Sequence, residues 1–423
     1  MNILLLGSGG REHALAASIT LSPHCTQLFV APGNAGTATL ATNLAINLLD
    51  FEKIAEACLK NQIKMVVAGS ELPLVKGIKD YFLAKPELAH ILIVGAGSRG
   101  AALEGSKHFA KIFMQQYGIP TAAYQSFTLE TLQNGIDYLS TQPLPIVLKA
   151  DGLAEGKGVI IAQTLAEAEK SLVEMLQNEQ FGVASQKVVI EQFLDGIELS
   201  VFVLTNGVEY KILPTAKDYK RIGVGDTGLN TGGMGAISPV PFADEIFMQK
   251  VETQIIKPTM LGLQTEGIPY YGFIFFGLIS VQGEPYVIEY NVRMGDPETQ
   301  AILPRIQSDF VALLLANFNH QLHDFELLID ERTAATVVLV SGGYPEDYQK
   351  NKLISGTELV ADSLVFEAGT TKLGDQTFTN GGRVLAITSF GKNKNEALAL
   401  CYKNAETIHF EAKYFRPDIG FDL

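Results

Sequence analysis

The sequence predicts a multidomain protein of the α/β and α+β classes, with a doubly wound parallel sheet at the N terminus and two α+β units after it. Three observations predict this fold. The chain has 423 residues, too many for one compact core. Short apolar runs alternate with helical stretches over the first hundred residues. Later strands come in neighbouring pairs joined by short turns, which is typical of antiparallel sheet.

The N-terminal unit is expected to be a βαβ series. Its predicted strands, each followed by glycine, proline or both, are Ile3–Leu6, Leu28–Val30, Met65–Ala68 and Ile91–Val94. Its predicted helices are Glu12–Leu21, Phe51–Asn61 and Leu72–Leu83. Ligands of such sheets bind at the carboxyl ends of the strands, where these glycine loops lie.

The pattern changes from about residue 106 onward. Helices are expected at Ser106–Tyr117, at Leu165–Gln177 and over about 243–266. Strands are expected at Ile146–Ala150, Val159–Ala162, Val188–Phe193, Leu199–Leu204, Tyr271–Val281 and Pro285–Asn291. The last ninety residues carry strands at Ala334–Val340 and Arg383–Thr388 and a helix at Asn395–Ile408, which predicts a small α+β cap.

Composition excludes several classes of protein. Hydrophobic residues make up 47% and charged residues 18%, as in an ordered globular chain. The net charge of −14 argues against a general binder of nucleic acid or membrane surfaces. Met1–Gly7 indicates a first strand rather than a signal peptide, and a cytoplasmic protein is expected. Cys25, Cys58 and Cys401 lack metal-ligand spacing and are expected to be small buried hydrophobes.

Two glycine-rich segments resemble nucleotide-binding signatures but fail on detail. Gly95–Gly100 matches G-x-G-x-x-G, yet no acidic residue follows at positions 115–125 to hold a ribose hydroxyl. An NAD-dependent oxidoreductase therefore stays a distant alternative. Gly152–Gly158 is one residue short of a P-loop, and Gly158 stands where a Ser or Thr would be needed.

A third segment, Gly7–His13, follows the first strand and opens the first helix. Free backbone N–H groups at a helix start, together with Arg11, suit a phosphate monoester. A tight structural turn explains the segment equally well.

The most informative stretch is Val287–Gln300. Strand alternation points Glu289, Asn291 and, by extension, Arg293 to one face. A carboxylate, an amide oxygen and a guanidinium together suit a magnesium–phosphate site. A solvent-facing polar edge is the alternative reading.

The string from Glu289 to Gln300 resembles the metal-binding signature of the phosphoribosylamine–glycine ligases, a family of the ATP-grasp superfamily. Other segments resemble the same family in the same order and cover essentially the whole chain. They are Gly9–Leu15, Ala31–Thr37, Pro73–Gly77, Leu103–Lys107, Lys149–Val159, Asp226–Gly235, Gly342–Pro345 and Asn380–Leu385.

The resemblance implies an N-terminal domain over 1–105, an ATP-grasp domain over 106–328 with a lid subdomain at about 122–192, and a C-terminal cap over 329–423. It implies ATP-dependent ligation of glycine to 5-phosphoribosylamine through a glycyl phosphate, with Mg²⁺ or Mn²⁺. Partners are expected to be small-molecule substrates, with no nucleic acid and no membrane, for a monomer or weak dimer. The nearest alternative is another ATP-grasp carboxylate–amine ligase with a different amine; a non-catalytic nucleotide sensor is a further one.

The resemblance also assigns roles to individual residues. ATP contacts fall on Lys107, Lys149, Lys157 in the lid loop, Glu191 on the adenine-binding edge, and Glu198 at the ribose. Glu289 and Asn291 are the expected metal ligands, Arg293 the phosphoryl-stabilising cation, and Asp296 lies near the glycine amino group. Phosphoribosylamine is expected at Gly9, Gly10, Arg11, Asn34 and Glu71.

The chain departs from the family pattern at five positions: Ser70, Ala96, Tyr219, Leu229 and Glu367. None of them removes an expected ATP, metal or phosphoryl ligand. They bear on the shape of the substrate pocket, and so on the choice of amine.

Overall fold

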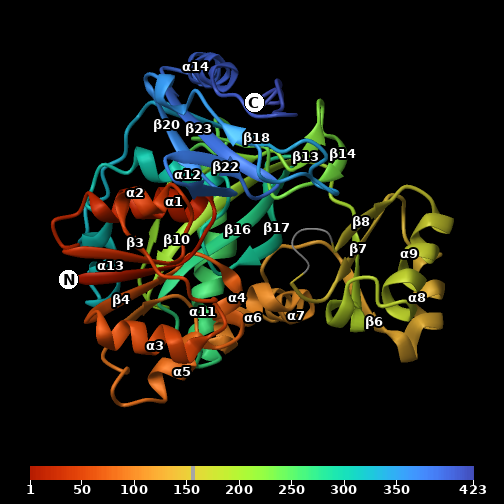
Figure 1. Cartoon of the computed structure of the whole chain (residues 1–423). Coiled ribbons are helices and arrows are strands. Elements are labelled where there is room, and N and C mark those ends of the chain that lie inside the picture. Colours follow the sequence, from red (N-terminus) through yellow and green to blue (C-terminus); the bar gives the residue numbers. More distant parts are fainter. Residues whose placement is uncertain (154–157) are drawn as a thin grey trace.

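The structure is a computed structural model that describes residues 1–153 and 158–423. Figure 1 shows a large body, with a smaller lobe standing to its right. Within the described ranges, no helix is long and apolar enough to cross a membrane.

The N-terminal sheet is parallel throughout, with the strand order β3-β2-β1-β4-β5. Its strands are β1 (Asn2–Gly7), β2 (Gln27–Pro32), β3 (Thr42–Asn43), β4 (Ile63–Ala68) and β5 (Leu92–Val94). Its helices are α1 (Gly10–Thr20), α2 (Thr37–Leu40), α3 (Phe51–Lys60), α4 (Glu71–Val75), α5 (Ile78–Leu83) and α6 (Ser98–Gly105). The chain leaves the central strand β1 in both directions, so the predicted doubly wound sheet is confirmed.

One predicted helix of this unit is wrong. The segment Leu72–Leu83 forms two helices, α4 and α5, instead of one. Gly77 interrupts them at φ +85°, in the left-handed region that glycine adopts without steric cost. The short edge strand β3 was not predicted, because two residues carry no readable alternation.

The lobe is a four-stranded antiparallel sheet in the order β6-β9-β7-β8, entered through α7 (Lys107–Gln116). Its elements are β6 (Tyr124–Thr128), α8 (Leu132–Leu139), β7 (Ile146–Ala150), β8 (Val159–Ala162), α9 (Leu165–Gln177) and β9 (Lys187–Gln192). Phe127, Leu148, Leu172 and Ile190 belong to a hydrophobic cluster made only of lobe residues. The lobe therefore has a core of its own.

The central sheet of the body has the order β11-β10-β16-β17 and is antiparallel. Its strands are β10 (Ile197–Thr205), β11 (Tyr210–Ile212), β16 (Gly272–Val281) and β17 (Glu284–Asn291). The helix expected over 243–266 consists of α10 (Glu245–Val251), a π-helical turn (Glu252–Ile256) and α11 (Lys257–Thr265). Two further helices, α12 (Glu298–Ile302) and α13 (Phe310–Phe318), follow β17.

The C-terminal part adds a five-stranded sheet in the order β12-β15-β18-β23-β20 and a small three-stranded sheet, β19-β22-β21. The first contains β12 (Lys217–Asp218), β15 (Gly235–Ser238), β18 (Thr333–Val340), β20 (Ser363–Glu367) and β23 (Arg383–Gly391). The second contains β19 (Leu353–Ile354), β21 (Thr370–Leu373) and β22 (Gln376–Thr379), and α14 (Lys394–Thr407) covers the larger sheet. Strands from both sides of residue 329 thus share one sheet.

A β-hairpin, β13 (Arg221–Gly223) with β14 (Thr227–Asn230), projects between β12 and β15. Two further hydrophobic clusters fill the body. One cluster joins Ile3 and Leu15 of the N-terminal unit to Phe273 of the central sheet and Val337 of the C-terminal sheet. The three sheets of the body are therefore packed as one unit.

Candidate active site

The end of β17 presents Glu289 and Asn291 on one face. In the pairing with β16, Gly277 lies opposite Glu289, while Leu278 lies opposite Val287, so Ile288 is the extra residue of a β-bulge. Asn291 is buried and Glu289 half-buried. Within the part of the chain that the structure describes, no hydrogen bond engages either side chain.

These free oxygens fit a hard divalent cation. Across residues 1–153 and 158–423, no group of three or more His, Cys, Asp or Glu is arranged to hold a metal. Glu289 and Asn291 supply one carboxylate and one amide oxygen, which are ligand types that Mg²⁺ accepts.

Lys149 joins the lobe to this strand. Its Nζ donates to the carbonyl of Ile288 at 3.1 Å and lies 3.1 Å from the carboxylate of Glu191. Lys111, which sequence reasoning missed, pairs with the same carboxylate at 3.0 Å. Burial alone would raise the pKa of Glu191, but the two ammonium groups outweigh it and lower that pKa. The side chain of Glu191 thus holds Lys149, and its buried Oε1 has no hydrogen-bond partner among the described residues.

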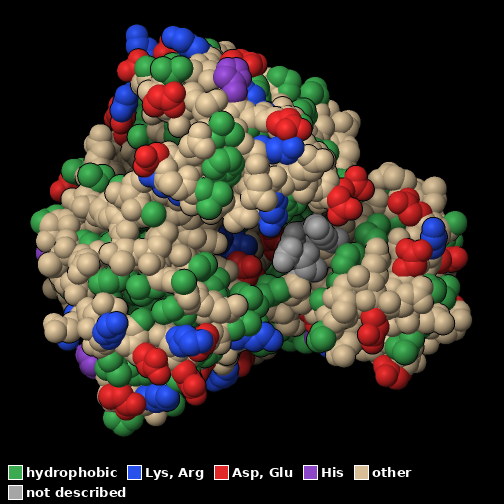
Figure 2. All heavy atoms as spheres, viewed as in Figure 1, with side chains coloured by type: hydrophobic (Ala, Val, Ile, Leu, Met, Phe, Trp, Pro, Cys, Tyr) green, Lys and Arg blue, Asp and Glu red, His purple; other side chains and the backbone are tan. Residues whose placement is uncertain are grey.

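Lys107 is the first residue of α7, a helix capped by Ser106. Its Nζ donates to the carbonyl of Gly152 at 2.9 Å. Burial lowers the pKa of Lys107, and the nearby carboxylate of Glu289 opposes this effect. Lys107 and Glu289 therefore belong to one electrostatic site. Lys157 lies outside the described residues. Figure 2 shows basic and acidic side chains gathered in the hollow between the body and the lobe.

Glu198 lies on β10 and pairs with Lys220 at 2.8 Å. Burial would raise the pKa of Glu198, but Lys220 outweighs it and the pKa is lowered. The carboxylates of Asp218, Glu198 and Glu289 overcome the effect of burial and raise the pKa of Lys220 well above its usual value. The Asp218–Arg221 segment, where the chain departs from the family at Tyr219, is thus part of the site.

Arg293 lies just beyond β17 and reaches toward the N-terminal unit. It pairs with Glu71 at 3.1 Å and with Glu104 at 2.9 Å. Glu104 also accepts a hydrogen bond from the backbone N–H of Val292 at 2.7 Å. Burial raises the pKa of Glu104 to about 7, although Arg293 opposes the rise. Glu71 and Arg293, predicted for different substrates, are therefore direct neighbours.

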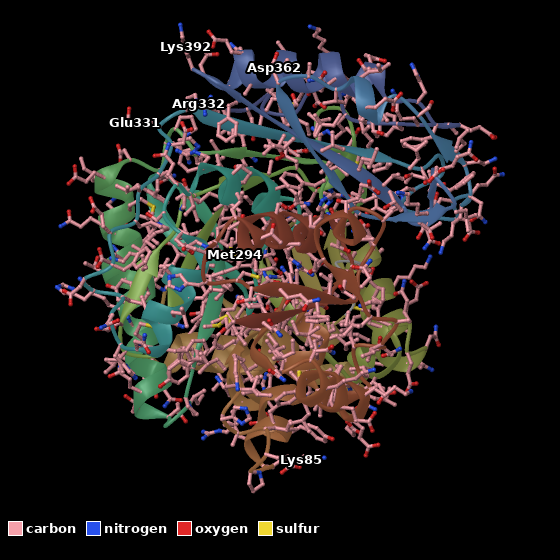
Figure 3. The ribbon with its side chains drawn as sticks, turned by 60° about the vertical axis from the view of Figure 1, so that its left-hand side comes forward. Lys85, Met294, Glu331, Arg332, Asp362 and Lys392 are labelled. Carbon is pink, nitrogen blue, oxygen red and sulfur yellow. The ribbon has the colours of Figure 1, made fainter. Side chains whose placement is uncertain are left out.

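The Gly9 loop meets the same segment from the other side. The backbone N–H of Gly9 donates to Glu12, whose other oxygen pairs with Arg11 at 2.7 Å. Arg11 also donates to the carbonyl of Met294 at 3.3 Å, and Met294 lies at the centre of the molecule in Figure 3. At Gly10 an added Cβ would lie 2.6 Å from Nε2 of Gln300, so a larger residue there would displace the Gln300 side chain. Arg11 is buried behind the loop rather than exposed on it.

A cavity of about 320 Å³ opens where this loop meets the C-terminal sheets. Its walls come from three parts of the chain: Ser8, Gly9, Gly33 and Asn34; Asp296; and Tyr344, Ala368, Gly369, Thr370, Asn380 and Arg383. Arg383 lies 3.3 Å from Asp296 and donates to its carbonyl at 2.7 Å. The cavity is therefore polar, and Arg383 gives its wall a positive charge.

Asn34 lines this cavity, but its amide is used by the protein. Its Nδ2 donates to the carbonyls of Ser8 and Glu367 at 2.9 and 2.7 Å, and its Oδ1 accepts from the N–H of Thr37 at 2.8 Å. Asn34 thus fixes the loop against the cap. His13 does the same, since its Nδ1 accepts from the N–H of Glu367 at 2.8 Å.

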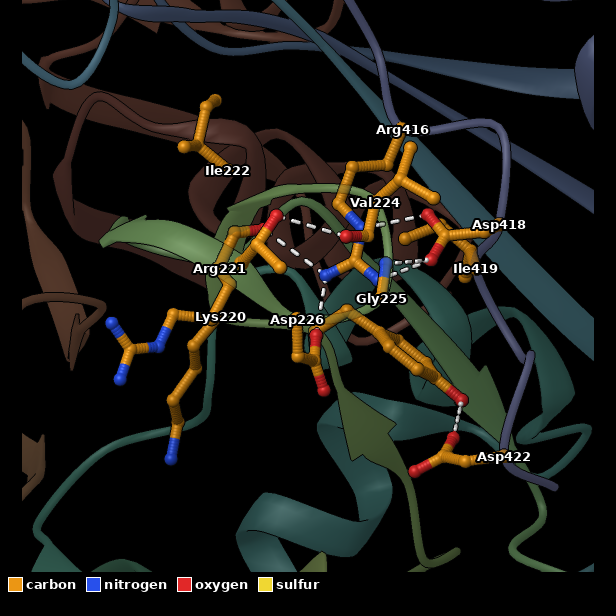
Figure 4. Close-up of polar contacts among 12 residues, drawn as sticks. Lys220, Arg221, Ile222, Val224, Gly225, Asp226, Arg416, Asp418, Ile419 and Asp422 are labelled. Carbon is orange, nitrogen blue, oxygen red and sulfur yellow. Dashed lines mark hydrogen bonds and ion pairs between the residues drawn. The ribbon is translucent and has the colours of Figure 1, made fainter.

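Arg416 anchors the β13–β14 hairpin to the C-terminal segment (Figure 4). It is fully buried and pairs with Asp226 in the hairpin and with Asp418 at 2.8 Å. The N–H of Gly225 donates to Asp418 at 2.7 Å. These contacts hold the hairpin that begins next to Lys220.

Sequence reasoning assigned no role to Lys111, Glu104, Asp218, Lys220 or the cap residues of the cavity. For Arg383 a signal existed, because it lies within the Asn380–Leu385 string that resembles the family. Lys111 gave none: on a predicted helix it is indistinguishable from a surface lysine.

Taken together, the lobe beside the hollow of the body and the acid–amide pair of β17 define an enzyme of the ATP-grasp class. Family models match consecutive parts of the chain: the N domain of phosphoribosylglycinamide synthetase over residues 1–104, its ATP-grasp (A) domain over 105–299 and its C domain over 334–422. The phosphoribosylamine–glycine ligase of Vibrio cholerae is 45% identical over 100% of this chain and 98% of its own length.

Solved structures agree. The crystal structure of phosphoribosylamine–glycine ligase from Thermotoga maritima has a TM-score of 0.85 and 36% identity, covering 99% of this chain and 100% of that one. A biotin carboxylase complex from Campylobacter jejuni shares the fold, with a TM-score of 0.72 at 13% identity over 99% and 93% of the two chains. This chain belongs to the phosphoribosylamine–glycine ligase family.

Proposed function

We propose that this chain ligates glycine to 5-phosphoribosylamine with ATP, giving glycinamide ribonucleotide, ADP and phosphate, a step of purine biosynthesis. The observation that carries the proposal is the course of residues 288–296. At its start, the carbonyl of Ile288 accepts a hydrogen bond from Lys149 of the lobe. At its end, Asp296 lines the wall of the polar cavity. One short segment thus joins a nucleotide site to a site for a second substrate.

The domains divide this work. We assign residues 1–105 to amine binding, 106–328 to ATP-grasp chemistry with a lid at about 122–192, and 329–423 to a cap over the amine. The separate core of the lobe supports the lid assignment.

The ATP site is assigned to the hollow between the lobe and the body. Lys107, Lys149 and Lys157 contact phosphates, backbone groups next to Glu191 bind adenine, and Glu198 accepts from the ribose hydroxyls. Glu289 and Asn291 would hold Mg²⁺ or Mn²⁺, which would neutralise phosphate charge.

The chemistry then runs in two steps. An oxygen of the glycine carboxylate attacks the γ-phosphorus, and the bond from that phosphorus to ADP breaks, giving glycyl phosphate. The amine of phosphoribosylamine attacks the acyl carbon, phosphate leaves, and the amine nitrogen loses a proton. Arg293 stabilises the transferred phosphoryl group, and the closed lobe excludes water that would hydrolyse the acyl phosphate.

The amine is assigned to the cavity between the Gly9 loop and the cap. Gly9, Gly10 and Asn34 shape its wall, while Arg11 adds positive charge behind it. Glu71 accepts from ribose hydroxyls, and Arg383 of the cap supplies a further cation. The acting form is proposed to be a cytoplasmic monomer or weak dimer that binds small molecules only.

The test is ADP release with ATP, Mg²⁺ and glycine, measured with and without freshly generated phosphoribosylamine. We expect release to depend on both substrates, with glycinamide ribonucleotide formed in equal amount. Release that does not respond to phosphoribosylamine would contradict the proposed amine, and a set of other amines would then be compared.

A further inference from the structure

A row of residues crosses the central sheet on the face that carries Glu289. Ala216 pairs with Ser200, Ser200 with Gly277, and Gly277 with Glu289. Register partners point to the same face of a sheet. Gly277 has no side chain, and an added Cβ there would lie 3.0 Å from Cγ of Glu289. Gly277 therefore forms a floor between Ser200 and the proposed metal ligand Glu289, whose side chain leans over it.

Two carboxylates border this floor. Glu298, at the start of α12, is 2% exposed, and its Oε1 accepts from Oγ of Ser200 at 3.0 Å. Asp218 lies two residues after Ala216, so alternation along β12 turns it to the same face. Among the described residues, no hydrogen bond engages the carboxylate of Asp218.

The charge here is unbalanced. Burial and the neighbouring charge of Asp218 raise the pKa of Glu298 to about 7. Burial also raises the pKa of Asp218, although Lys220 opposes the rise. Lys220 already forms an ion pair with Glu198. Its positive charge therefore compensates the negative charges of Asp218 and Glu298 only in part. The pair favours one small cation with hydrogen atoms to donate.

We propose that Asp218 and Glu298 bind the ammonium group of glycine over Gly277, which directs the glycine carboxylate toward the proposed phosphoryl-transfer site at the end of β17. The assignment rests on the proposed function and replaces Asp296 as the amino-group partner. Asp296 is already engaged, at 3.3 Å by Arg383 and at 2.8 Å by Nε2 of Gln300. It belongs to the wall of the amine cavity instead.

The test is steady-state kinetics of Asp218→Asn and Glu298→Gln with each of the three substrates. Both substitutions keep the shape of the side chain and remove its charge. We expect the KM for glycine to rise at least about 10-fold, as for loss of a charged hydrogen bond. The KM values for ATP and phosphoribosylamine should stay within about 2-fold of wild type, which lies below the effect of one such bond.

Asp422→Asn is the matched control. Asp422 pairs with Lys217, whose side chain lies on the opposite face of β12, at 3.1 Å. The control should keep the wild-type KM for glycine. Wild-type values for glycine in both active-site variants would overturn the assignment. A shift in the Mg²⁺ requirement alone, with glycine unaffected, would also overturn it by placing a metal between the carboxylates.

A second measurement does not depend on the variants folding. Glycolate has a hydroxyl group in place of the ammonium group, so it should inhibit the wild-type enzyme only weakly in competition with glycine. An inhibition constant for glycolate as low as the KM for glycine would overturn the assignment. A different result would contradict the proposed function itself: ADP release by the wild-type protein that does not depend on glycine and phosphoribosylamine.

Discussion

Lys149 of the lobe donates to the carbonyl of Ile288, one residue before the predicted metal ligand Glu289, at 3.1 Å. The bulge at Ile288 sets the register of the strand at this point. The proposed phosphate-binding lysine therefore contacts the strand position next to the proposed metal-binding carboxylate. This contact joins the lobe to the body at the place where the phosphoryl group would transfer.

Replacing Lys149 with Met should therefore impair both ATP binding and turnover. The variant removes the ammonium group that Glu191 holds in place. We expect kcat/KM for ATP to fall at least about 10-fold, as for loss of one charge-assisted hydrogen bond. Steady-state kinetics with varied ATP checks this. Lys170→Met, on the exposed side of the lobe, is the control and should behave as wild type.

Replacing Glu289 with Ala should remove activity through the metal. Loss of groups that only support a metal ligand costs up to about 100-fold, so loss of the ligand itself should cost at least that much in kcat. ADP release is measured over a range of Mg²⁺ concentrations. Glu284→Ala, an exposed site on the same strand, should retain wild-type rates. Full activity of Glu289→Ala in saturating Mg²⁺ would show that Glu289 is not a ligand.

Replacing Arg383 with Ala should weaken binding of phosphoribosylamine. Arg383 is the cation of the cavity wall and also holds Asp296 and the carbonyl of Gly232. We expect the KM for the amine to rise about 10-fold or more, with the KM for ATP nearly unchanged. Arg332→Ala, which breaks an exposed pair with Asp330, is the matched control. An equal rise in the KM for ATP would contradict the prediction, because Arg383 would then stabilise the fold in general rather than bind the amine.

His13 should make folding stability depend on pH. Burial lowers the pKa of His13 to about 4, against 6.5 in the unfolded chain, so the folded state keeps it neutral. The unfolded state binds the proton first as the pH falls, so stability is lost from about pH 6.5 down to about pH 4. The loss amounts to about 3 kcal/mol at most. Denaturant unfolding of wild type and His13→Asn across this range measures it; parallel curves would contradict the prediction.

Much of the fold could be predicted because its elements carry local signals. The parallel strands of the first unit are short apolar runs ended by glycine, and β17 and β16 were predicted nearly to the residue. The break at Gly77 could not be predicted, since a single glycine inside an apolar pattern does not reveal its φ. Nor could the sharing of one sheet by β15 and β18, which lie far apart in the sequence.

The candidate site shows the same division. Strand alternation correctly placed Glu289 and Asn291 on one face. The partners of Arg293 could not be predicted, because Glu71 and Glu104 come from distant segments that only the folded chain brings together. The same holds for Asn34, whose amide is occupied by the carbonyl of a cap residue.

The most direct test of the central claim follows the carboxylate oxygen of glycine. Glycine labelled with ¹⁸O in its carboxyl group is turned over with ATP, Mg²⁺ and phosphoribosylamine, and the released phosphate is analysed by mass spectrometry. Activation through glycyl phosphate predicts one labelled oxygen in each phosphate formed. Phosphate without the label would contradict the account, because the carboxylate would then never have been phosphorylated.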